Sequence, residues 1–168
     1  MLNLKVEESI NDQINAELFS AYLYLSMSAY LESENLPGFA SWMRVQFQEE
    51  QAHAMKFFDY VNERGGKVTL EAIEAPQTEW ASVVEIFEHT LSHERMVTER
   101  INHLMDVALE ERDYATESFL RWYIDEQVEE EASAEAILSQ LERLEGHGNG
   151  MIMLDRELGT RVFTPIAE

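Results

Sequence analysis

The residues best suited to chemistry lie in an acidic run, Asp125-Glu126-Gln127-Val128-Glu129-Glu130-Glu131. Steps of three and four through this run define a helical face of Leu120, Tyr123, Gln127, Glu130, Ala134, Ile137, Leu141 and Leu144. Gln127 and Glu130 therefore interrupt an apolar face, whereas Asp125 and Glu131 fit a solvated one. A buried carboxylate costs several kcal/mol unless it is paired or bound to a cation. The rest of the chain must supply that partner.

Three other helical faces carry polar interruptions of the same kind. They consist of Val6, Ile10, Gln13, Glu17, Ser20, Tyr24, Met27 and Leu31; of Phe39, Met43, Gln46, Glu50, His53, Phe57 and Tyr60; and of Val83, Phe87, Thr90, Glu94, Val97, Ile101 and Leu104. The spacing Glu50-x-x-His53 places a carboxylate and an imidazole one turn apart on one face. The single glutamate of each face lies near the middle of its helix, so all four meet at one level whichever way the helices run.

Taken singly, these polar residues have ordinary explanations. A lone glutamate on an apolar face is usually a boundary residue, and His53 alone is more often a core histidine than a ligand. Four carboxylates, one imidazole and one amide at one level would leave about four negative charges in a low-dielectric core, which requires cations. Hard oxygen ligands with one imidazole suit Fe(II) or Mn(II), with zinc able to compete, rather than calcium. Bridging carboxylates would allow two metals close together.

Composition narrows the classes of function. The 168 residues suffice for one packed domain. The absence of cysteine excludes disulfides, iron–sulfur clusters, thiolate zinc sites and cysteine nucleophiles. The N-terminal residues lack the features of a signal peptide, so we expect a cytoplasmic location.

Charge and hydropathy narrow the partners. The net charge of −21 disfavours nucleic acid and anionic membranes and favours cations. The longest uncharged stretch, Leu18 to Leu31, contains three serines and three tyrosines and is shorter than the ~20 apolar residues of a membrane span. We therefore expect no nucleic-acid partner and no membrane association.

The few glycines and prolines cluster between long helical stretches. We predict helices from about Val6 to Ser33, from just after Asn35-Leu36-Pro37-Gly38 to Gly65-Gly66, from about Ala81 to Glu110, and from just after Glu111-Arg112-Asp113 to near Gly146. Residues 65–80 contain Pro76 and favour an extended segment. A short fifth helix is predicted over Met151 to Val162, and a loose tail after Pro165.

Connection lengths predict the topology. The first and third breaks span only a few residues, so each flanking pair of helices must be antiparallel. The middle connection is long enough to run the length of the bundle and leave the second and third helices parallel. We predict one all-α domain over 1–168, a four-helix bundle (about 5–145) with one long crossover and a short fifth helix (about 150–162).

At the polar positions the sequence resembles the ferritins, specifically the non-haem prokaryotic type, over essentially its whole length. Glu17, the Glu50-x-x-His53 pair, Glu94 and the Glu126-Gln127-x-x-Glu130 run lie where ferritins keep their ferroxidase ligands. The resemblance implies a first iron held by Glu17, Glu50 and His53, and a second held by Glu50, Glu94 and Glu130. It also places Gln127 near the second iron and Tyr24 beside the centre. Glu49, Glu126 and Glu129, with Glu130, resemble the third iron site of prokaryotic ferritins.

Departures from related patterns are informative. Bacterioferritins and rubrerythrins have a second Glu-x-x-His motif, where this chain has Gln127-x-x-Glu130. Ala52 stands where bacterioferritins carry the methionine that ligates haem, so we expect no haem. Animal ferritins line a channel with two acids at the start of the fourth helix; Glu117 matches one, but Leu120 replaces the other. The route by which iron enters is therefore open.

The resemblance implies an iron-storage ferroxidase that oxidises Fe(II) with dioxygen or peroxide and deposits Fe(III) mineral inside a 24-subunit homo-oligomeric shell. Apolar side chains on several sides of the first helix, among them Tyr22 and Leu25, also favour subunit contacts. Two alternatives stay open: a bundle that binds structural divalent ions or a partner protein without catalysis, and a di-iron oxygenase or peroxidase acting on an organic substrate.

Two weaker motifs have simpler interpretations. His89-x-x-x-His93 has the spacing of a metal-binding pair, but it lies beside the apolar face, and we expect a surface pair. Gly146-x-Gly148-x-Gly150 follows a helix and lacks the strand that a phosphate-binding loop requires, so we interpret it as a linker.

Overall fold

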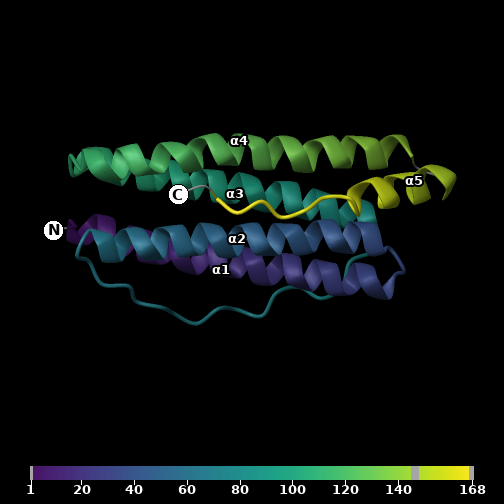
Figure 1. Cartoon of the computed structure of the whole chain (residues 1–168), viewed down its shortest axis with the longest axis horizontal. Coiled ribbons are helices and arrows are strands. Elements are labelled where there is room, and N and C mark those ends of the chain that lie inside the picture. Colours follow the sequence, from purple (N-terminus) through teal and green to yellow (C-terminus); the bar gives the residue numbers. More distant parts are fainter. Residues whose placement is uncertain (1, 145–147, 167–168) are drawn as a thin grey trace.

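The computed structural model describes residues 2–144 and 148–166, and its regular elements within these ranges are five helices. They are α1 (Leu4–Ser33), α2 (Pro37–Glu63), α3 (Val83–Glu110), α4 (Tyr114–Arg143) and α5 (Gly148–Leu158). The four long helices lie side by side, and α5 lies at one end of them (Figure 1). The predicted four-helix bundle with a short C-terminal helix is confirmed.

Side chains from the preceding residue cap three of the long helices. Asn3 accepts a hydrogen bond from the Lys5 amide at the start of α1, Ser82 from the Glu85 amide at the start of α3, and Asp113 from the Thr116 amide at the start of α4. The corresponding residue of α2, Leu36, has no such side chain. There the capping acceptor comes from α5, because Asp155 Oδ1 accepts from the amides of Gly38 at 2.8 Å and Phe39 at 3.0 Å.

The connections have the predicted lengths and directions. The α1–α2 and α3–α4 turns are tight, with positive φ at Asn35 (59°) and Arg112 (55°). The crossover, residues 64–82, follows α1 along the bundle: Thr69 bonds Asn11 near one end, and Trp80 accepts from Tyr30 near the other. Figure 1 shows this long trace returning the chain to the end of the bundle where α2 began. Consequently α2 and α3 run parallel.

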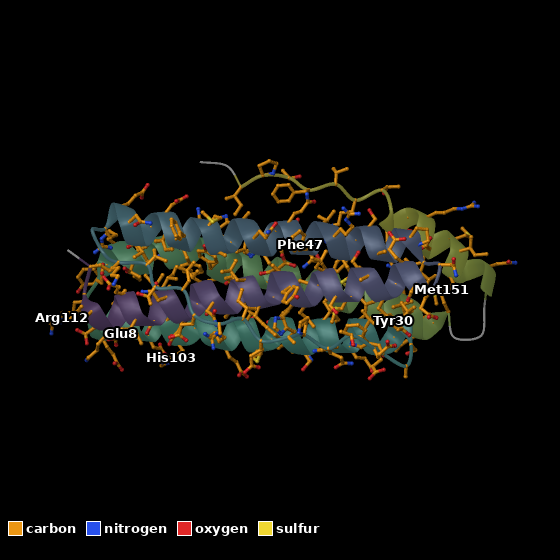
Figure 2. All side chains as sticks on the ribbon, turned by 90° about the horizontal axis from the view of Figure 1, so that it is seen from below. Glu8, Tyr30, Phe47, His103, Arg112 and Met151 are labelled. Carbon is orange, nitrogen blue, oxygen red and sulfur yellow. The ribbon has the colours of Figure 1, made fainter. Side chains whose placement is uncertain are left out.

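Apolar packing is divided into two clusters with a polar level between them. One cluster contains Leu31, Phe39, Phe87 and Leu141, and the other contains Ile10, Phe57, Ile101 and Leu120. Each of α1 to α4 contributes to both clusters. The residues of each helix between its two apolar stretches are therefore held at the middle of the bundle by packing on both sides. Figure 2 shows side chains filling the space between the helices.

Several helix boundaries differ from the sequence-based prediction. Helix α2 begins at Pro37 because proline is compatible with the first helical turn and Asp155 caps the amides beyond it. Helix α5 runs from Gly148 and ends at Leu158, rather than from Met151 to Val162. Helix α4 ends at Arg143, and its predicted end near Gly146 lies outside the described residues, as do 167–168 of the predicted loose tail. Among the described helices, none is long and apolar enough to cross a membrane.

Candidate metal centre

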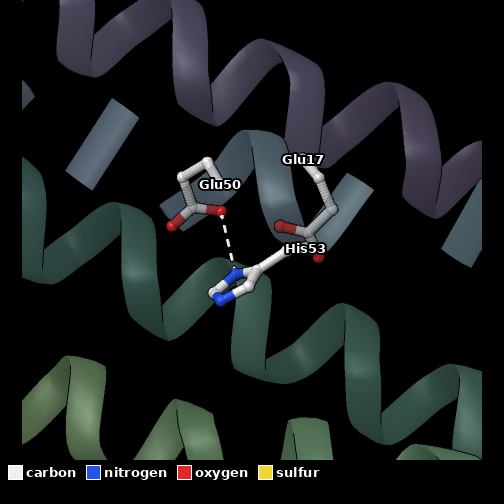
Figure 3. A group of neighbouring side chains, drawn as sticks. All are labelled: Glu17, Glu50 and His53. Atoms are coloured by element: carbon white, nitrogen blue, oxygen red, sulfur yellow. Dashed lines mark ion pairs between the residues drawn. The ribbon is translucent and has the colours of Figure 1, made fainter. Parts of the chain in front are cut away.

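Three potential ligands converge from α1 and α2 at the polar level. Glu17 points inward from α1, and Glu50 and His53 point inward from α2 (Figure 3). One ligand atom from each lies within 4.8 Å of the others. All three residues are at least 98% buried. The predicted one-turn spacing of Glu50 and His53 thus places both groups at one point.

Two carboxylate oxygens in this group are buried and lack a hydrogen-bond donor in the described chain. Glu17 Oε2 and Glu50 Oε2 have no hydrogen-bond partner within the described part of the chain. His53 Nδ1 lies 3.5 Å from Glu50 Oε2, which is close enough for electrostatic attraction but too long for a good hydrogen bond. Buried carboxylate oxygens without a donor are costly. Two carboxylates and an imidazole nitrogen within 4.8 Å therefore fit a divalent cation of the iron or zinc type.

Glu94 and Glu130 approach the same level from α3 and α4. Both are at least 95% buried, and their charges act on Glu50. Glu94 accepts hydrogen bonds from the Tyr24 hydroxyl and from Gln127 Nε2, the latter at 3.2 Å. Gln46 Nε2 donates to Glu130 Oε2 at 2.9 Å. Hydrogen bonds thus join Glu94 to Tyr24 and Gln127. Within the described chain, the group of ligand atoms within 4.8 Å of one another contains Glu17, Glu50 and His53, but neither Glu94 nor Glu130.

Clustering of the acids in the buried core shifts their pKa values. Burial, followed by the charge of Glu130, raises the pKa of Glu94 to about 8, against opposing hydrogen bonds from Tyr24 and Gln127. Burial, followed by the charges of Glu94 and Glu17, raises the pKa of Glu50 well above its usual value. Near neutral pH the metal-free centre therefore holds protons that a cation would displace.

A second group of acids, Glu49, Glu126 and Glu129, lies beside the buried centre and is more exposed to solvent. The ligand atoms of His53, Glu126 and Glu130 lie within 4.8 Å of one another, so His53 is shared between the two groups. The Glu49 and Glu126 side chains are 19% and 28% exposed, and Glu129 is exposed. Burial raises the pKa of Glu49 to about 7, although the nearby guanidinium of Arg161 opposes the shift. Of the three acids, only Glu126 has a ligand atom within 4.8 Å of those of His53 and Glu130 among the described residues.

Sequence reasoning missed several residues that contact the centre. Gln13 Nε2 donates to Glu17 Oε1 at 2.8 Å, and Gln46 makes the corresponding bond to Glu130. Gln13 stands four residues before Glu17, and this spacing could have indicated their bond. Gln46 stands four residues before Glu50 but donates to Glu130 of α4, a contact that the spacing does not indicate. Arg161 Nη2 contacts Glu49 Oε2 at 2.6 Å from 112 residues away, and no local pattern indicates that contact.

The prediction that His89 and His93 form a surface pair is wrong, because His93 is 6% exposed and its Nε2 lies 2.8 Å from Ser20 Oγ. His89 is half-buried and accepts from Trp80 Nε1 through Nδ1. Burial lowers the pKa of His93 to about 4, so it is neutral at physiological pH.

Leu120, where animal ferritins have a channel acid, lies in the core, and Glu117 pairs with Arg121 at 2.5 Å.

Comparisons with known proteins show the family and the fold of the chain. The family model of the ferritin-like domain matches residues 7–144. The chain is 41% identical to a bacterial non-haem ferritin of Staphylococcus aureus (97% of this chain and 98% of that one) and 43% identical to that of Bacteroides fragilis (96% and 100%). The open-pore ferritin of Archaeoglobus fulgidus superposes with a TM-score of 0.96 at 51% identity, covering 96% of this chain and all of the other. Matched by sequence, fold and family model over nearly its whole length, the chain belongs to the ferritin family.

Proposed function

We propose that this protein is an iron-storage ferroxidase. It binds Fe(II) at the centre inside the bundle, oxidises it with dioxygen or peroxide, and deposits Fe(III) as mineral inside a hollow homo-oligomeric shell of 24 subunits. The observation that carries the proposal is the pair of buried, unpartnered oxygens of Glu17 and Glu50, which lie beside an imidazole and two further buried carboxylates. Membership of the ferritin family supports iron as the metal.

Each residue has a proposed role. Glu17, Glu50 and His53 bind the first iron, and Glu50, Glu94 and Glu130 bind the second, so Glu50 bridges the two. Gln127 lies near the second iron and donates to Glu94, and Tyr24 donates to the same carboxylate. Glu49, Glu126 and Glu129, with Glu130, bind a third iron on the solvent-exposed side of the centre. No haem takes part in this scheme.

The reaction balances with two irons and one oxidant. Two Fe(II) ions each lose one electron, and dioxygen takes up both electrons with two protons to give hydrogen peroxide; peroxide as oxidant would give two waters. The protein fixes the metal spacing, and a shared carboxylate couples the two one-electron steps. The protons that Glu50 and Glu94 hold in the metal-free protein are released when Fe(II) binds, because carboxylate ligands must be deprotonated.

Replacing Glu50 tests the assignment directly. We expect Glu50→Ala to lower the initial rate of Fe(II) oxidation by at least ~100-fold, since loss of a supporting residue alone costs 10–100-fold at metal sites. The shell should still assemble. Asp125→Ala, an exposed acid of α4, is the matched control and should oxidise iron at the wild-type rate. Stopped-flow absorbance that shows wild-type oxidation by Glu50→Ala would disprove the site assignment.

Iron loading distinguishes the proposal from the two alternative functions. A storage protein takes up hundreds of irons per shell on aerobic loading, whereas a structural metal bundle or a di-iron oxygenase saturates at a few per chain. Size-exclusion chromatography of loaded protein, with iron staining of the eluted peak, measures both the assembly and its content. A peak with only a few irons per chain would contradict storage while leaving metal binding intact.

A further inference from the structure

The segment that follows α5, residues 159–166, returns along α2 on the flank of the bundle (Figure 1 and Figure 2). Its only basic residue, Arg161, turns toward α2 instead of solvent, and its side chain is 25% exposed. Nη1 donates to Gln46 Oε1 at 2.5 Å, and Nη2 donates to Glu49 Oε2 at 2.6 Å. The guanidinium carbon lies 4.6 Å from the centre of the Trp42 ring. Arg161 is therefore held by three partners.

The three partners form one stripe on α2. Trp42, Gln46 and Glu49 are spaced by four and three residues, so they stand in line on one helical face. A planar guanidinium can stack on an aromatic ring and donate through its fork to an amide oxygen and a carboxylate together. A lysine ammonium has no such fork. The stripe thus matches arginine specifically.

The position of Arg161 follows from the docking of α5. Asp155 caps the amides at the start of α2, and the backbones approach closely at a glycine pair. A Cβ on Gly38 would lie 1.6 Å from the Asp155 carbonyl oxygen, and one on Gly159 would lie 3.2 Å from the Gly38 Cα. Arg161 begins only two residues beyond this contact. Its side chain is thereby brought to the same stripe of α2 in each folded subunit.

Arg161 is also linked to the buried centre through Gln46. Arg161 donates to the side-chain oxygen of Gln46, Oε1. The side-chain nitrogen Nε2 must therefore face Glu130, to which it donates at 2.9 Å. Arg100 makes a similar link from the other side: its Nε donates to Gln13 Oε1 at 3.2 Å, and Gln13 donates to Glu17. Arg161 differs in that it also donates directly to Glu49, which belongs to the more exposed group of acids.

We propose that Arg161 is a positioning residue that competes with metal for Glu49, so that the outer acids bind their cation only after the guanidinium releases that carboxylate. This inference rests on the proposed function, because it takes Glu49, Glu126 and Glu129 as the outer metal position. The guanidinium is a cation tethered within the fold. Among the ligands proposed for the first iron, Glu17 Oε2 and Glu50 Oε2 have no hydrogen-bond donor to displace in the described chain, so we expect that position to fill before the outer one.

The test uses Zn²⁺, which binds such sites without being oxidised. Calorimetric titration of assembled, metal-free protein gives the number of sites and their affinities, and zinc-edge anomalous maps of soaked crystals locate them. We expect Arg161→Gln to raise the affinity of the outer position about tenfold, the effect of losing one charge-assisted hydrogen bond. Arg161→Lys, which keeps the charge without the fork, should give a smaller increase.

Two controls separate competition from other effects. Arg156→Gln removes the same charge from an exposed position on α5 and should leave the outer affinity unchanged. In a Glu49→Gln background, Arg161→Gln should leave the outer metal affinity unchanged, whereas an effect that Arg161 exerts through Gln46 or Trp42 would still change that affinity. Equal outer affinity in wild type and Arg161→Gln, or an equal change in Arg156→Gln, overturns the proposal. Wild-type protein that binds no zinc at the buried centre of Glu17, Glu50 and His53 would overturn the proposed function and this inference with it.

Discussion

Individual side chains of the centre combine two opposing properties. A carboxylate must be ionised to bind a cation, yet burial favours its neutral form. Tyr24 and Gln127 donate to Glu94, and Gln13 and Gln46 donate to Glu17 and Glu130. Such bonds offset part of the cost of the charged form, as the pKa of Glu94 shows, and still leave it near 8. If all were ionised, the clustered carboxylates would repel one another in the buried core, and a bound cation would relieve that repulsion.

The stability of metal-free protein should fall as pH rises from 6.5 to 8. In this range the folded state keeps protons on Glu50 and Glu94, and partly on Glu49, that the unfolded chain with carboxyl pKa values near 4.5 has already lost. Each such fully buried carboxyl contributes up to about 1.4 kcal/mol per pH unit. His93, with its pKa lowered to about 4, acts in the opposite direction, and this contribution fades as pH rises through the ordinary histidine pKa of 6.5.

Denaturant titrations of chelator-treated protein at several pH values measure this slope. Glu94→Gln should make the slope shallower, because one of the groups that bind protons is removed. Saturating Zn²⁺ should raise the free energy of unfolding and reverse the slope, since metal replaces the protons. A stability that stays flat or rises between pH 6.5 and 8 without metal would show that these carboxyls are ionised in the folded protein.

Among the helices, α5 has a role beyond closing one end of the bundle. Asp155 supplies the acceptor that the start of α2 lacks, and its negative charge lies at the positive end of the α2 dipole. We expect Asp155→Ala to lower the free energy of unfolding by about 1 kcal/mol, the typical cost of losing a helix cap. It should also speed amide exchange in α5 and in residues 159–166.

Glu157→Ala is the matched control for this substitution. Glu157 is an exposed acid of the same helix, and among the described residues its side chain makes no hydrogen bond. It should leave both the unfolding free energy and the exchange of α5 unchanged. Equal exchange in Asp155→Ala and wild type would mean that the glycine contact alone holds α5 in place.

Over the whole molecule, the surface carries apolar side chains that the single chain leaves exposed. Tyr22 and Leu25 on α1 are 49% and 37% exposed, and Leu70 and Ile73 are exposed on the crossover, which follows α1. Exposed apolar surface of this kind indicates contact with further subunits. It supports the proposed shell, in which these residues would become buried.

Leu25→Glu should therefore shift the assembly toward smaller species. A carboxylate placed in an apolar subunit contact would be desolvated without a partner, which is costly. Gln51→Glu adds the same charge at an exposed polar position of α2 and serves as control. Sedimentation velocity measures the size distribution, and unchanged shells in Leu25→Glu would place the subunit contact elsewhere.

The helices and the polar level were predictable from sequence for one physical reason. The period of the α-helix determines which residues share a face, so apolar faces interrupted at Glu17, Glu50, Glu94 and Glu130 are local properties of the chain. Connection lengths then fixed which neighbours are antiparallel. The roles of these residues as iron ligands stay a prediction, because the structure holds the side chains together without identifying the metal.

Tertiary structure alone decided contacts between residues far apart in the chain. Arg161 pairs with Glu49 across 112 residues, and Asp155 caps α2 across 117, because α5 docks where no local period could place it. His93 shows the same limit, since a position beside an apolar face becomes buried when Ser20 and the Phe19 and Tyr24 rings of α1 pack against it. Periodicity describes each helix by itself, whereas the rotation and height of one helix against the next depend on packing of the whole bundle.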